Sequence, residues 1–273
     1  MFNMDVLTSY SFLIVGSGTF LLAAMAGAVG CITVLKGQSL IGDAIGHAAF
    51  PGIVLSFMLF LQREPVLLTL GAVVSGTTAF MLIQVIKENS KLELDAILAV
   101  ILSSFFGVGM VLKSHIQGNS AYKDAAQSGL SSYIFGQAAY IMKDDVKLIV
   151  YVGIPMLVLL ILFYKEIKVF LFDEIYASTI GIKTVLLYGI ILVMTMGIIA
   201  TGLKLVGAIL ISSLLIIPAI TALQWSDKFG WVLIIAGVVG GVSALIGTYI
   251  STAYEGMSTG ATIILIMGSL AII

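Results

Sequence analysis

Charged residues are scarce in this chain. Only 10% of its 273 residues are Asp, Glu, Lys or Arg, whereas 60% are hydrophobic. A soluble globular domain carries about 25% charged residues, so the composition predicts a polytopic membrane protein embedded in the lipid bilayer. The net charge of −1 provides no basic surface that would favour binding to nucleic acid.

Several motifs are also missing. The single cysteine, Cys31, excludes an intrachain disulfide framework and a CxxC site. No basic residue precedes residue 11 and no small-residue cleavage site follows a short apolar run, so we expect the first span to act as its own insertion signal. The chain has no GxxxxGK[ST] phosphate loop, since 36–39 reads Lys-Gly-Gln-Ser in the reverse order. We therefore expect no ATP hydrolysis in this chain.

Long apolar runs take the place of these motifs. A spanning helix needs roughly 20 apolar residues, and nine segments approach or exceed that length, although the last is short. They are 11–35, 40–61, 66–86, 96–112, 146–164, 185–200, 205–223, 231–252 and 261–273. The junction at 201–204 is brief enough for the sixth and seventh segments to merge with a kink, which would leave eight spans. The predicted fold is an all-α helical bundle forming one transmembrane domain over 1–273.

Two connections are longer than the others, 113–145 and 165–183. The first contains an apolar patch at 131–140 that is too short to span, so we expect an interfacial or re-entrant piece. Lysine and arginine counts do not orient the chain, because the two sides carry nearly equal numbers. If 165–183 lies on the cytoplasmic side, 113–145 is an extracellular loop.

Segment 165–183 contains the pattern of a short helix. Asp173 is a suitable N-cap, Glu174 suits the positive helix end, and Gly181 suits the position after the C-cap. Such a helix would leave apolar side chains uncovered, namely Ile175, Tyr176, Thr179 and Ile180. It is either an interfacial connector or a docking helix for a soluble partner, and periodicity does not separate the two.

Asp43 and His47 stand four residues apart at the start of the second span. On a helix they share a face, with Cβ atoms about 5–6 Å apart, and carboxylate oxygen plus imidazole nitrogen is a common ligand set for a first-row metal. Pro51 lacks an N–H for the His47 carbonyl, which frees that oxygen as another ligand. A solvated aspartate and a packing histidine are the alternative, but ionisable groups within a membrane are usually functional. We expect a metal or proton site.

Small and polar residues mark two further places. Gly42 and Gly46 form a small-xxx-small pair that allows close approach of another helix. In the seventh span, Ser212 and Ser213 are expected to make interhelical hydrogen bonds or to line a pathway. Pro218 removes a helical hydrogen bond there and is expected to kink the helix.

The segment from Leu35 to Gly52 resembles the signature of the permease subunits of bacterial manganese/zinc/iron ABC importers, the ABC-3 family. Other segments agree with this family in order and spacing, namely 92–98, 133–136, 172–181 and 206–222. The resemblance covers roughly 12–270. It implies a permease like that of type II ABC importers, in the plasma membrane of a bacterium.

The resemblance also implies partners and roles. Two permease copies would pair with two cytoplasmic ATP-binding subunits, and an extracellular metal-binding lipoprotein would deliver the cargo. The coupling residues would lie in 165–183, namely Phe172, Asp173, Glu174, Ala177 and Gly181. Asp43 and His47 of both copies would bind the metal at the dimer axis, where Gly42, Gly46 and Gly52 would allow tight packing. The ending at His47–Gly52 is more typical of manganese- and iron-type members than of zinc-type ones, which makes manganese the favoured cargo, and no cofactor would be bound permanently.

Two other functions fit parts of the sequence. A proton-coupled secondary metal transporter would use Asp43 and His47 as a relay, but such proteins often contain repeats, and this chain has no second Asp–His pair. An intramembrane aspartyl protease would use Gly42-Asp43 with a second aspartate. Asp95, at a membrane edge, is a poor partner.

Overall fold

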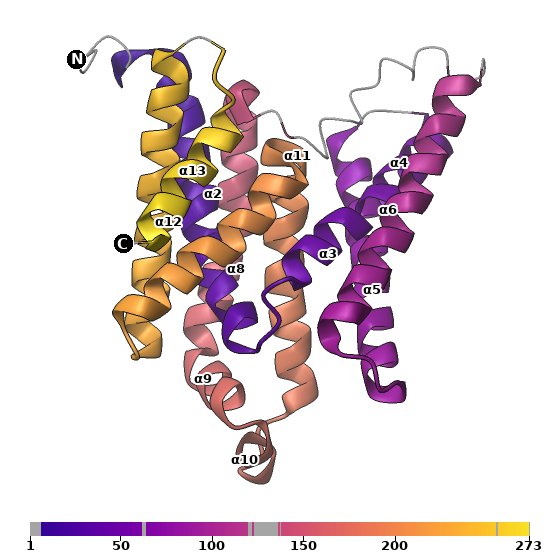
Figure 1. Cartoon of the computed structure of the whole chain (residues 1–273), viewed down its shortest axis with the longest axis vertical. Coiled ribbons are helices and arrows are strands. Elements are labelled where there is room, and N and C mark those ends of the chain that lie inside the picture. Colours follow the sequence, from indigo (N-terminus) through magenta and orange to yellow (C-terminus); the bar gives the residue numbers. More distant parts are fainter. Residues whose placement is uncertain are drawn as a thin grey trace. The chain divides into compact units, whose positions relative to one another are not determined.

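The computed structural model describes residues 7–61, 64–119, 122, 136, 138–254 and 256–272, and the regular elements in this part are helices (Figure 1). Seven of these helical segments are long and apolar enough to cross a membrane, and a shorter apolar helix follows them. The predicted all-α, polytopic fold is therefore confirmed, whereas the seven candidate spans among the described residues are fewer than the predicted eight or nine. The helices form two compact units, which are described in turn.

Unit 1 comprises Met1–Ser39, Gln137–Ile198 and Ser213–Ile273. Its elements are α2 (Tyr10–Leu35), η2 (Ala138–Tyr140), α8 (Lys143–Leu162), α9 (Tyr164–Phe172), α10 (Glu174–Thr179), the two outer parts of α11 (Thr184–Trp225), α12 (Phe229–Ala253) and α13 (Thr259–Ile272). Glycines let α2 and α12 touch backbone to backbone. A Cβ added at Gly27 would lie 2.6 Å from the Ala236 carbonyl oxygen, and one at Gly240 would lie 2.7 Å from that of Ala23. Close packing of this kind is a main source of helix association in lipid.

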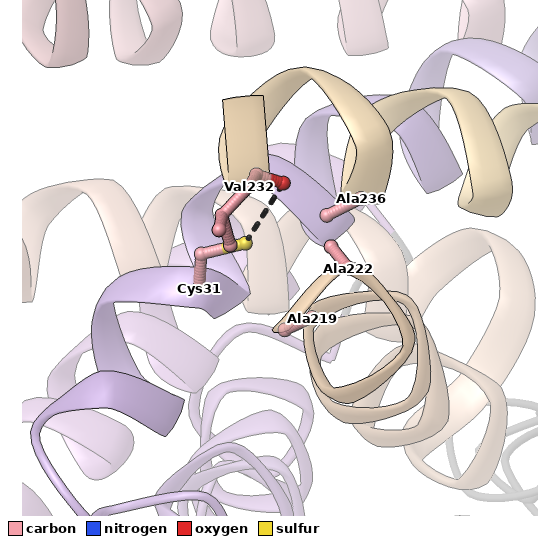
Figure 2. Packing of buried hydrophobic residues seen from close by; sticks show 5 residues of the cluster. All are labelled: Cys31, Ala219, Ala222, Val232 and Ala236. Carbon is pink, nitrogen blue, oxygen red and sulfur yellow. Dashed lines mark hydrogen bonds between the residues drawn. The ribbon is translucent and has the colours of Figure 1, made fainter. Parts of the chain in front are cut away.

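Small buried side chains complete this packing. Cys31 of α2 faces Ala219 and Ala222 of α11 and Val232 and Ala236 of α12 (Figure 2). The Cys31 Sγ lies 3.2 Å from the Gly27 carbonyl oxygen and 3.8 Å from that of Val232. The cysteine is thus a core residue that fills a narrow space between three helices.

Unit 2 comprises Leu40–Gly136 and Ile199–Ser212. Its helices are α3 (Ile41–Ala48), α4 (Phe50–Phe60), α5 (Pro65–Asn89), α6 (Leu94–Gly118) and the middle of α11. A Cβ at Gly109 of α6 would press on the Phe50 ring, so α6 also lies close against the start of α4. Unit 2 carries the Asp43–His47 pair.

Helix α11 corrects two of the predicted boundaries. It has 42 residues and contains both the sixth and seventh predicted spans, and the expected junction at 201–204 is helical. The break lies at Gly207, whose φ of 82° and ψ of 170° are accessible essentially to glycine alone. Pro218 lies inside the helix with helical backbone dihedrals, so the expected kink there stays a prediction. A continuous helix of this length would be about twice the thickness of the hydrocarbon core, so Gly207 separates two spans.

Other boundaries agree in part with those predicted. The second predicted span, 40–61, is confirmed as Ile41–Phe60, within which α3 and α4 meet at Ala49. The expected loop 113–145 begins with helix, because α6 continues to Gly118, and it ends with the first turn of α8. Most of the remainder, including 131–135 of the apolar patch, lies outside the described residues.

Candidate metal site and docking helix

The break between α3 and α4 has a local cause. Pro51 stands in the first turn of α4, where its missing N–H costs no helical hydrogen bond. The carbonyl oxygen of Ala48 accepts a hydrogen bond of 2.7 Å from the Ser75 hydroxyl of α5. Helix α3 therefore ends one residue after His47, and a neighbouring helix supports its last turn.

Asp43 and His47 lie on the same side of α3, as the spacing predicted. The His47 Nε2 is 3.6 Å from the Asp43 Oδ1, with side-chain exposures of 18% and 35% respectively. The His47 Nδ1 is buried and has no hydrogen-bond partner among the described residues. The imidazole packs edge-on against Phe106 of α6, with ring centroids 5.1 Å apart and an interplanar angle of 84°. An anionic oxygen and an aromatic nitrogen thus converge beside an apolar wall.

The pair does not complete a metal site within the described part of the chain. No group of three or more His, Cys, Asp and Glu side chains comes together there. Two donors from one helix leave at least half of the positions of a four- to six-coordinate ion open. Further ligands would have to come from another copy, from backbone carbonyls or from water.

The glycines expected near this site lie in different surroundings. Gly42 and Gly46 are buried on α3, and a Cβ at Gly46 would meet only Ala208, at 3.9 Å, among the described atoms. Gly52, by contrast, packs within the chain against Gly71 of α5, where a Cβ would overlap the carbonyl oxygen. Packing within one chain therefore explains the glycine at position 52, and no contact between two copies of the chain is needed.

Ser212 of the seventh predicted span bonds within its own helix and not, among the described residues, across to another one. The Ser212 hydroxyl is buried and donates to the Ala208 carbonyl oxygen of its own helix at 2.8 Å. Ser213, the next residue, is partly buried. Pro218 lies between two glycines of unit 1, since a Cβ at Gly27 would be 3.2 Å from its ring and one at Gly240 would be 3.4 Å away.

The predicted short helix in 165–183 is α10, and its caps are those expected. The Asp173 Oδ1 accepts a hydrogen bond of 2.8 Å from the Tyr176 N–H. At the other end Gly181 has φ +86°, and Ile182 N–H donates to the Ala177 carbonyl at 3.0 Å. This is a Schellman motif, in which a left-handed glycine ends a helix. A preceding helix, α9, was not expected.

The apolar surface expected on α10 is present. Ile175 is 79% exposed, and Phe172, Tyr176 and Ile180 are also exposed, whereas Ala177 is fully buried against the rest of unit 1. Figure 1 shows α10 at the end of unit 1 beyond α9. Six residues cannot cross a membrane, so α10 is either an interfacial connector or a docking helix, as the sequence indicated.

Sequence reasoning missed the residues that hold α10 to the rest of unit 1. Lys36 of α2 pairs with Glu174 of α10, and Phe170 and Tyr188 surround the lysine. The sequence does show a single lysine, Lys36, directly after a long apolar run. Its partner Glu174 could not be identified because it lies 138 residues away.

Comparisons with known proteins agree on one family. The sequence matches the ABC 3 transport family over residues 9–273. It is 40% identical over 249 residues to the manganese transport system membrane protein MntC of Bacillus subtilis, covering 91% of this chain and 57% of that protein. The chain thus spans little more than half the length of the Bacillus protein.

Two further relatives are covered over more of their length. Identity is 33% to the zinc transport system membrane protein TroC of Treponema pallidum, covering 99% of this chain and 90% of that protein. Among solved structures, PsaBC from Streptococcus pneumoniae in complex with Fab matches with a TM-score of 0.83 and 28% identity, covering 98% of this chain and 92% of that one.

Proposed function

Because the chain belongs to the ABC 3 transport family, we propose that it is the membrane permease subunit of an ATP-driven importer for a divalent transition metal. It would act in a bacterial plasma membrane as a homodimer, with two cytoplasmic ATP-binding subunits and an extracellular metal-binding lipoprotein. The chain supplies the path for the ion, and the partner subunits supply the energy.

The observation that carries this proposal is the Asp43–His47 pair. The Nε2 and Oδ1 atoms lie 3.6 Å apart in an otherwise apolar chain, and ionisable groups in such a setting usually serve transport. Two copies would bring two carboxylates and two imidazoles to one ion. The two negative charges would balance a divalent cation, which lowers the cost of removing its hydration shell.

Manganese is the cargo that we favour. MntC is named for manganese and TroC for zinc, and YfeD of Yersinia pestis, 34% identical over 237 residues, is named for chelated iron. A carboxylate–imidazole site accepts all three ions. The choice of manganese rests on the Bacillus relative and on the His47–Gly52 ending of the signature.

Helix α10 is the proposed docking element for the ATP-binding subunit. Its capped ends hold a short, rigid helix, and its exposed apolar side chains offer a hydrophobic patch to a groove. Phe172, Asp173, Glu174, Ala177 and Gly181 are the residues assigned to this coupling segment.

The test is metal uptake by proteoliposomes that contain the whole complex, with ATP inside and metal-loaded delivery protein outside. We expect Asp43→Asn and His47→Ala to reduce manganese uptake to background while the complex still assembles. The matched controls are Asp95→Asn and His115→Ala, since both residues are exposed on α6. These should retain uptake.

Each other outcome has a clear meaning. Normal uptake by the Asp43 and His47 variants would show that the pair is structural. Uptake without ATP that follows a proton gradient would favour the secondary transporter instead. Competition by zinc or iron at equal concentration would measure the preference for manganese.

A further inference from the structure

Lys36 occupies a sheltered position at the end of α2. It is the C-cap residue of that helix, and only 15% of its side chain is exposed. A cation there is favoured by the negative end of the helix dipole. Burial of an ammonium group is costly without compensating partners, so the side chains around the Lys36 Nζ have to offset this cost.

Three side chains provide these contacts. The Lys36 Nζ lies 2.7 Å from the Glu174 Oε2 and 3.8 Å from the centroid of the Phe170 ring, a distance typical of a cation–π interaction. The Tyr188 hydroxyl is 3.1 and 3.0 Å from the two Glu174 carboxylate oxygens and 3.5 Å from the Lys36 Nζ. Tyr188 also packs edge-on against Phe170, with centroids 4.8 Å apart. We call these four residues the lysine clamp.

The lysine clamp joins four helices of unit 1. Lys36 is the C-cap residue of α2, and Phe170, Glu174 and Tyr188 belong to α9, α10 and α11 respectively. Glu174 is the first residue of α10, the helix with the exposed apolar face, and Tyr188 restrains its carboxylate through both oxygens. An exposed ion pair alone contributes little, but this pair is sheltered on the lysine side and is supported by two aromatic rings.

Lys36 lies close in the sequence to the helix that carries the Asp43–His47 pair. Gly37, with φ +68°, ends α2, and only the short turn 37–40 separates Lys36 from α3. Helix α3 carries Asp43 and His47. The ion pair and this turn therefore connect Glu174 to the start of α3 through a short stretch of chain.

We propose that Lys36 is a positioning residue that couples the docking helix α10 to the helix that carries the Asp43–His47 pair. The proposal rests on the proposed function, since it needs an ATP-binding partner on α10 and a metal at α3. Lys36 does not touch the metal. It transmits movement between the two elements.

The experiment measures the number of metal ions imported per ATP hydrolysed by the complete complex in proteoliposomes. Lys36→Met keeps an unbranched side chain but removes the charge, and Glu174→Gln keeps a polar group for Tyr188 but removes the carboxylate. We expect both variants to lower this ratio by about fivefold or more, the usual lower range for coupling between sites. The double variant should be no worse than Lys36→Met, because both substitutions break one interaction.

Two further variants separate coupling from stability. Lys36→Arg should restore most of the ratio, because guanidinium also pairs with carboxylate and stacks on aromatic rings. Lys147→Met is the matched control, since it breaks an exposed pair with Asp144 at the start of α8, and it should leave the ratio unchanged.

The outcomes distinguish the two proposals. A wild-type complex without ATP-dependent uptake overturns the proposed function before any variant is compared. Wild-type uptake with an unchanged ratio in Lys36→Met and Glu174→Gln overturns the coupling role. If Lys36→Met does not assemble, Glu174→Gln decides once co-purification with the ATP-binding subunit shows that docking is intact, since Glu174 also belongs to the docking segment. A docked Glu174→Gln complex with an unchanged ratio overturns the coupling role.

Discussion

Gly52 of α4 crosses Gly71 of α5 so closely that neither position has room for a side chain. A Cβ at either glycine would overlap the carbonyl oxygen of the other, and one at Gly71 would also meet the Ser56 hydroxyl. Helix α4 begins directly after the break that ends the His47 helix. The glycine crossing therefore holds the chain in place immediately beyond the proposed metal ligands.

Replacement of Gly52 by alanine should destabilise the permease by about 1–3 kcal/mol, because the added methyl overpacks a rigid backbone contact. The midpoint of thermal unfolding of the purified protein in detergent measures this effect. Gly107→Ala is the control, since a Cβ there meets no described atom within 4 Å, and alanine in a helix is favoured over glycine. Equal shifts in both variants would contradict this explanation of Gly52.

Removal of the Asp173 side chain should loosen α10. Its Oδ1 accepts the Tyr176 N–H, and loss of such a cap costs about 1 kcal/mol of local helix stability. Asp173→Ala should speed amide hydrogen exchange over 174–179 and weaken binding of the ATP-binding subunit. Asp173→Asn keeps an acceptor and should behave like the wild type, and slow exchange in the alanine variant would show that the cap is dispensable.

A polar residue at Ile175 should prevent assembly without unfolding the permease. The side chain is 79% exposed on α10, so its replacement by serine removes little internal packing but much of the proposed contact surface. Co-purification with the ATP-binding subunit is the measurement. The control is Met142→Ser, where a 69% exposed side chain precedes α8. If both variants assemble normally, the apolar face of α10 is not the docking surface.

Gly207→Ala should be the most damaging glycine substitution in α11. The backbone at Gly207 has φ 82° and ψ 170°, which costs a side-chain-bearing residue about 1–3 kcal/mol. Gly189→Ala in the same helix should be tolerated, because a Cβ there would have no described neighbour within 4 Å. The yield of monodisperse protein after extraction distinguishes the two, and similar yields would contradict the assigned strain.

Local patterns explain which predictions succeeded. The caps of α10 depend on Asp173 and Gly181, which act within a few residues of their own positions, and the shared face of Asp43 and His47 follows from helical spacing. The predicted position of the break in α11 was wrong, because a glycine permits an unusual backbone conformation without requiring it. In the folded chain Gly136 packs directly against the Val206 carbonyl beside Gly207, and no local pattern in the sequence shows that contact.

The sequence by itself determined the membrane class, the helical fold, the acid–histidine pair and the short capped helix, because each depends on composition or on residues within one or two turns. Tertiary structure alone decided that Lys36 meets Glu174 across 138 positions, that Gly52 meets Gly71, and that α11 breaks at Gly207. These contacts depend on which helices become neighbours. That choice follows from packing summed over many side chains, which no short segment specifies.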